Sequence, residues 1–130
     1  MPYSFEYDPG NRVLRGLLQD RVSEADLREL YARSFQQVVV LRPVAYITDT
    51  SGVTSFDVNP ETIRYLATSR PQVPPGCARY IVAPADFMFG IARMFEILGG
   101  SSRPDLRVVR SLAAAYKDLG LAEPHFELVP

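Results

Sequence analysis

Segments typical of strands alternate with segments typical of helices along almost the whole chain, and proline or glycine separates them. The order is β-β-α-β-α-β-α-β-α. Strands joined by helices pair in parallel through right-handed crossovers, so this order constrains the fold more than any other feature. It predicts one α/β domain over residues 1–130, with four helices, a mixed and mostly parallel sheet of about five strands, and an N-terminal antiparallel hairpin.

Local chemistry predicts where the first elements begin and end. Residues 3–7 alternate aromatic and polar side chains, the turn-forming residues 8–11 follow, and residues 12–18 form a second extended run. Ser23 caps the first helix, with Asp26 at the reciprocal position of a capping box. An antiparallel hairpin followed by a helix is therefore expected at the start of the chain.

The later boundaries rest on similar signals. A strand over residues 44–48 runs into a turn at residues 49–52, and a second helix begins with Asn59 as its cap and Pro60 in its first turn. Beyond it we expect a strand at 78–82, a helix from near Asp86 to Gly99, a strand at 106–109, and a last helix between Ser111 and Gly120. Residues 125–129 fit either a short strand or an ordered tail.

The crossovers also predict how the helices are arranged. If each strand lies beside its predecessor, every crossover turns the same way and all helices cover one face of the sheet. The opposite face would then be half open.

Composition narrows the classes of partner and location. Fourteen Lys+Arg balance 15 Asp+Glu, and the net charge of −1 gives no basic surface for nucleic acid. The apolar stretches are shorter than the ~20 residues that a membrane-spanning helix needs. Cys77 is the only cysteine and the first ten residues lack the apolar run of a signal peptide, so we expect a cytoplasmic protein that is not integral to a membrane.

Residues for standard catalytic centres are scarce. His125 is the only histidine and lies near the end of the chain, while Cys77 precedes a strand and is expected to be a small buried apolar residue. One histidine and one cysteine cannot form a His/Cys metal site, and the glycine-rich phosphate loops are missing. We therefore expect neither a catalytic residue of these types, nor a bound metal, nor a cofactor.

One group of polar residues follows the predicted central strand and precedes a helix. Open α/β sheets place ligands at such positions. The same residues also make turns and helix caps, and this alternative stays open. The candidate binding residues are Asp49, Thr50, Ser51, Asp57 and Asn59.

The third predicted helix is apolar around most of its circumference, from Phe87 to Leu98. A single buried face cannot cover all of these side chains. A second copy of the chain, an apolar ligand or the neighbouring proline-rich segment could cover the surplus. We predict a homodimer with Met88, Ile91 and Phe95 at the interface, and Met88 and Phe95 pointing outward.

The order of short motifs resembles the STAS superfamily, the SpoIIAA-like fold, and in particular its small stand-alone bacterial STAS/Sec14-like members. The resemblance covers nearly the whole chain. It rests on residues 22–27 at the first helix, 47–53 at the end of the central strand, 89–94 in the third helix and 108–115 before and within the fourth. It implies a superhelix of β-α units.

In the regulatory STAS members, an Asp-Ser-Ser-Gly loop at a helix start carries a serine that a partner kinase phosphorylates. The corresponding stretch here is residues 57–60, where Asp57 is kept but Val58 occupies the position of the phosphoacceptor. The resemblance therefore implies a STAS-like module without that phosphorylation switch.

Two functions follow from these observations. The first is a non-catalytic regulatory or binding module that recognises a regulatory protein or a small apolar or anionic ligand. The alternative is a small enzyme that uses the carboxylates of Asp49 and Asp57 on an unidentified substrate.

Overall fold

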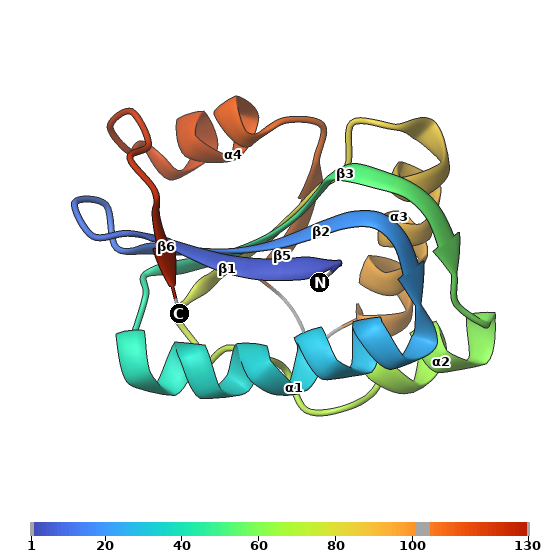
Figure 1. The fold of residues 1–130 in the computed structure, drawn as a ribbon. Coiled ribbons are helices and arrows are strands. Elements are labelled where there is room, and N and C mark those ends of the chain that lie inside the picture. The colour runs from blue at the N-terminus through green and yellow to red at the C-terminus, as the bar shows by residue number, and fades with distance from the viewer. Residues whose placement is uncertain (1, 101–104, 130) are drawn as a thin grey trace.

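The computed structural model describes residues 2–100 and 105–129, which form a six-stranded sheet with helices on both faces (Figure 1). The strand order is β5-β4-β3-β2-β1-β6; β2 to β5 are parallel, and β1 is antiparallel to both of its neighbours. The predicted α/β class, hairpin and four helices are confirmed. The strands are β1 (Tyr3–Asp8), β2 (Val13–Ser23), β3 (Ala45–Asp57), β4 (Ala78–Val82), β5 (Leu106–Val109) and β6 (Glu127–Val129), and the helices are α1 (Glu24–Leu41), α2 (Pro60–Ala67), α3 (Asp86–Gly99) and α4 (Leu112–Leu119).

The helices begin where the capping residues predict. Ser23 and Asp26 form a reciprocal capping box at α1, and the Asn59 side chain accepts a hydrogen bond from the Glu61 amide at α2. Ser111 caps α4, which ends at Gly120 in the left-handed conformation. Local hydrogen bonding thus sets these boundaries.

The helices divide between the two faces of the sheet, and the expectation that all of them cover one face is wrong for α4. In Figure 1, α1, α2 and α3 lie on one side and α4 on the other. We call these sides the α1 face and the α4 face. The first three helices connect neighbouring parallel strands, whereas α4 leads from β5 at one edge to β6 at the other, beside β1, so no crossover rule holds it on the α1 face.

The predicted turn at residues 49–52 is also wrong, because these residues lie inside β3. β4 ends opposite Asp49, but β2 and β3 stay paired from Gln19 and Gly52 to Ser23 and Asp57. Two register shifts in the β2–β3 pairing, each with one extra residue in β3, accompany the bend of this two-stranded ribbon, and Asp20 of β2 takes a positive φ of 58° there. Pairing with β2 therefore outweighs the turn propensity of the local sequence.

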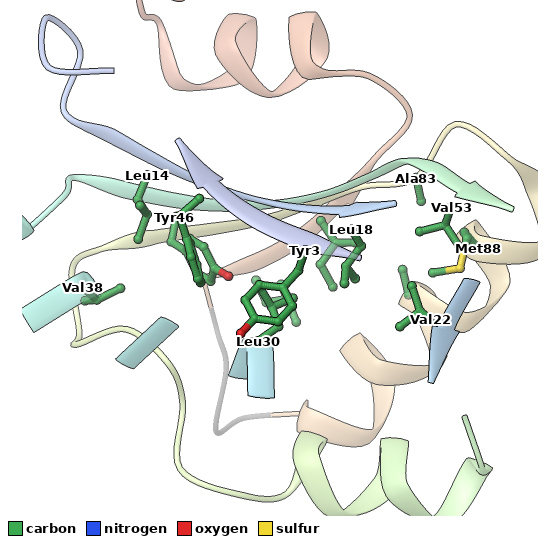
Figure 2. Packing of buried hydrophobic residues seen from close by; sticks show 14 residues of the cluster. Tyr3, Leu14, Leu18, Val22, Leu30, Val38, Tyr46, Val53, Ala83 and Met88 are labelled. Carbon is green, nitrogen blue, oxygen red and sulfur yellow. The ribbon is translucent and has the colours of Figure 1, made fainter. Parts of the chain in front are cut away.

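The main core fills the α1 face. Tyr46, Leu14 and Leu30 are at most 2 % exposed, and Val22, Val53 and Met88 gather under the bent ribbon (Figure 2). A smaller cluster on the α4 face joins Ala115 and Tyr116 to the sheet. In the described part of the chain, no helix has the length and apolar character needed to cross a bilayer.

Candidate functional site

The structure separates the predicted binding residues. Asp49 and Asp57 are eight positions apart on one continuous strand, so at about 3.3 Å per residue up to roughly 26 Å lies between them. Each side chain has a structural partner: Thr50 Oγ1 donates to the Val82 carbonyl (2.8 Å), and Arg21 Nε donates to Asp57 Oδ2 (2.6 Å). Asn59 caps α2. The two carboxylates do not share one pocket.

Asp49 lies on the α4 face in a partly buried charge network. Its Oδ1 accepts hydrogen bonds from the Ser51 amide (3.0 Å) and hydroxyl (2.5 Å), and its Oδ2 lies 3.4 Å from Arg15 Nη1. Arg15 also pairs with Glu6 and stacks on Phe126, with 4.1 Å between Cζ and the ring centroid. These contacts fix the carboxylate of Asp49 within the sheet surface.

Cys77 and His125 are not arranged for nucleophilic catalysis. Cys77 is buried, and desolvation raises the pKa of its thiol to about 11, which disfavours the reactive thiolate. His125 is exposed, and its backbone amide donates to the Asp8 carboxylate. Within residues 2–100 and 105–129, no group of three His, Cys, Asp or Glu side chains is placed to hold a metal ion.

A cavity of about 70 Å³ lies between the α1 face of the sheet and the three helices that cover it. Four of its lining residues are only partly buried, which places the cavity near the surface between α1, β3 and α3: Leu27, Phe56, Ile91 and Phe95. Leu18, Leu30, Ile63, Leu66, Ile81, Met88 and Ala92 form most of the remaining wall. The space is therefore predominantly apolar.

One polar wall of the cavity is formed by Arg79, Gln72 and Thr48. Arg79 is 6 % exposed; its Nε and Nη2 donate to Gln72 Oε1 (3.2 and 3.1 Å), and Nη2 also donates to Thr48 Oγ1 (2.8 Å). The guanidinium stacks on Tyr46 with Cζ 4.5 Å from the ring centroid. Gln72 Nε2 donates to Ser34 Oγ (3.0 Å), so this network joins β4, the proline-rich segment and α1.

The sequence does not indicate Arg79 and Gln72 as site residues. The alternation in β4 separates the side of Arg79 from that of Tyr80, but it does not reveal which side faces the helices. Gln72 lies in the irregular segment between Pro71 and Pro74, which has no helical or strand periodicity, so the sequence does not predict that its side chain is buried.

The structure also changes the expectation for α3. Ile91 and Phe95 line the cavity, whereas Met88 is 3 % exposed, so the prediction that Met88 points outward is wrong. The large apolar side chains that α3 leaves exposed are Phe87 (46 %) and Ile97 (68 %). Some of the apolar side chains of α3 therefore line the cavity, and others are exposed to solvent.

No protein-family model matches this chain. None of the curated proteins matches it either.

Proposed function

We propose that this domain is a non-catalytic binding module that holds a small apolar ligand in the cavity between the sheet and α1, α2 and α3. The observation that carries the proposal is the cavity itself. About 70 Å³ of unfilled space costs roughly 1.5–2 kcal/mol at ~24 cal/mol per Å³, so an apolar group that fills it regains part of that free energy.

The size of the cavity sets the size of the ligand. An engineered apolar cavity of ~150 Å³ binds benzene or xenon, and this cavity has about half that volume. An aliphatic group of a few carbon atoms fits it, either as a small molecule or as the end of a longer chain.

The test uses linear alcohols from 1-propanol to 1-hexanol as probes. We expect saturable shifts of the Ile63, Leu66 and Ile91 methyl signals in NMR spectra, with an optimum chain length. Ile91→Ala enlarges the cavity and should move the optimum to longer alcohols. Ile97→Ala removes the same atoms from an exposed position on α3 and should leave the optimum unchanged.

Two outcomes contradict the proposal. One is a linear, non-saturable shift for every alcohol in the wild-type protein. The other is an identical optimum in the wild-type protein and in Ile91→Ala, provided that circular dichroism shows the variant to be folded.

We also propose that the module is STAS-like and lacks the phosphorylation switch. The support is the opening hairpin followed by successive β-α units in the order that the resemblance implies. Val58, directly before the α2 cap, offers no hydroxyl. We expect that Val58→Ser alone does not create the switch, because Pro60 fixes the backbone and removes an amide; efficient phosphorylation of this variant by an anti-sigma kinase would contradict the assignment.

A homodimer in the reducing cytoplasm is the proposed state of the protein. Phe87, Met94 and Ile97 recur on one side of α3, and two of them are exposed, which supports self-association through this helix. The buried thiol of Cys77 suits a reducing compartment. Sedimentation should show a dimer that Ile97→Glu dissociates and that Leu128→Glu, at an equally exposed apolar site on β6, leaves intact.

A further inference from the structure

Helix α1 carries a second stripe of residues besides the one that packs on the sheet. Its buried residues are Leu30, Tyr31, Ser34 and Val38. The second stripe repeats at alternating spacings of four and three residues, which places its members on one side of the helix. It consists of Arg28, Ala32, Phe35 and Val39. Arg42, the residue that caps the C-terminus of α1 in the left-handed conformation, lies beyond its end and lines the same surface, so an arginine stands at each end of the apolar side chains.

This stripe lines a surface groove. A hollow of about 480 Å³ lies between α1 and α2, and another of about 760 Å³ lies between α1 and residues 70–75. Both hollows are lined by Phe35, Val39 and Arg70, so they join into one groove along α1, which we call the α1 groove. Val39 and Tyr65, on opposite sides of it, are 69 % and 60 % exposed.

The walls of the α1 groove are held by contacts within the chain. Arg28 stacks on Tyr65 and Arg70 stacks on Phe35, with 5.5 and 5.2 Å between Cζ and the ring centroids. The Tyr31 hydroxyl donates to the Arg70 carbonyl (2.8 Å), and three prolines stiffen the following segment. A preformed groove loses little conformational entropy when a partner binds.

The charge of the α1 groove has one sign. Arg28, Arg42 and Arg70 line it, and no Asp or Glu does so among the described residues. None of the six ion pairs formed within the described residues involves these three arginines. An occupant that combines apolar side chains with carboxylates would therefore match the groove in both polarity and charge.

We propose that the α1 groove docks an acidic amphipathic helix of a partner protein. The alternating spacing of Ala32, Phe35 and Val39 suits the side chains of a second helix laid along α1. Arg28 and Arg42 are 14 positions apart, so the groove is roughly 21 Å long at ~1.5 Å per residue, or about four helical turns. The α1 groove and the cavity share Tyr31, Leu66 and Gln72 in their linings. Arg28, Arg70 and Tyr65 line only the groove, so changes at these residues test docking separately from the proposed cavity ligand.

The test is a selection of random 16-residue peptides displayed on phage against the full chain, followed by fluorescence anisotropy of the selected peptides. We expect enrichment of Asp and Glu among Leu, Ile and Phe at helical spacing. Arg28→Glu combined with Arg70→Glu should weaken binding at least about tenfold, because both cations lose their carboxylate partners. Tyr65→Ala should weaken it through lost apolar contact.

Arg107→Glu is the matched control, since Arg107 is an exposed arginine (68 %) on β5, far from α1 in the sheet order. It should bind the selected peptides like the wild-type protein. Selected peptides that are neutral or basic, or whose affinity is unchanged in the Arg28→Glu, Arg70→Glu variant, would overturn the proposal.

A lipid surface is the competing occupant. Vesicles of phosphatidylcholine with phosphatidylserine should not retain the protein in co-sedimentation. Retention that disappears in the double variant would assign the α1 groove to an anionic membrane and overturn the helix-docking proposal.

Discussion

The two faces of the sheet are covered by different means. On the α1 face, three helices bury a large apolar cluster that extends under the bent β2–β3 ribbon. On the α4 face, one short helix covers a smaller apolar cluster, and polar contacts also hold this helix on the sheet. Asp8 accepts hydrogen bonds from the Tyr116 hydroxyl (2.7 Å) and from the side chain of Asn11 (2.8 Å).

This difference separates two sources of stability. Apolar burial is largely insensitive to pH, whereas contacts to a buried carboxylate depend on its ionisation. The α1 face should therefore dominate the free energy of unfolding, and Asp8 on the α4 face should add a pH-dependent contribution. The following changes test this division, from the largest expected effect to the smallest.

Leu30→Ala should cost about 2–5 kcal/mol of unfolding free energy, because Leu30 on α1 is 2 % exposed within the main core. Leu112→Ala is the matched change on α4, where the side chain is only partly buried, and it should cost less than about 2 kcal/mol. Urea denaturation measures both. Equal losses would contradict the dominance of the α1 face.

Gly16→Ala should cost about 1–3 kcal/mol, because its new methyl group would lie 2.7 Å from the Tyr46 hydroxyl oxygen. Within the described part of the chain that hydroxyl is buried, and although the Ser34 and Thr48 side chains lie near it, it makes no hydrogen bond of normal geometry. Tyr46→Phe alone should therefore leave stability unchanged or raise it by up to about 1 kcal/mol.

Combining Gly16→Ala with Tyr46→Phe completes this test, since the second change removes the clashing oxygen. The double variant should recover most of the loss measured by thermal denaturation. If the stability changes of Gly16→Ala and Tyr46→Phe simply add in the double variant, the close approach to the Tyr46 hydroxyl does not cause the loss seen with Gly16→Ala.

Tyr116→Phe should cost about 1–2 kcal/mol at pH 7 and progressively less in acid. Burial acts to raise the pKa of Asp8, but hydrogen bonds from Asn11, Tyr116 and the His125 amide outweigh it, so the pKa lies below its ordinary value. The stabilisation is therefore complete above the unfolded-state pKa near ~4 and is lost as pH falls through the lower, folded-state value.

Urea denaturation between pH 7 and pH 2.5 checks this behaviour as the difference between wild type and variant. Tyr65→Phe is the control, because Tyr65 is exposed and its loss should have no pH-dependent effect. If the loss of unfolding free energy in Tyr116→Phe stays constant down to pH 2.5, the contribution of the Tyr116 hydroxyl does not depend on the ionisation of Asp8.

Arg15→Met should give the smallest loss of stability among the destabilising changes, about 1 kcal/mol, and the loss should shrink in 1 M salt. Arg15 pairs with Glu6 and Asp49 near the surface of the α4 face, and the methionine side chain keeps apolar contact with Phe126. A loss above about 3 kcal/mol, measured at low salt, would make this charge network as important as the apolar core.

The candidate site could be predicted only in part. Ile91 and Phe95 were predicted at a homodimer interface because the third helix is apolar around most of its circumference, and the structure places both in the lining of the cavity. The polar residues from Asp49 to Asn59 were predicted from the order strand-loop-helix, but β3 runs through most of that loop. Arg79 was not predicted as a site residue, because alternation along a strand does not identify which side of the strand is buried.

The sequence by itself determined the elements whose ends depend on neighbouring residues. The helix caps at Ser23 and Asn59 and the glycine at 120 act within a few residues, so they can be predicted along the chain, and with them the order of strands and helices. The tertiary structure decided the length of β3, the face of the sheet that α4 covers and the face on which the Arg79 side chain lies. These depend on pairing with β2, on the path to β6 and on packing between segments far apart in sequence, which no local pattern records.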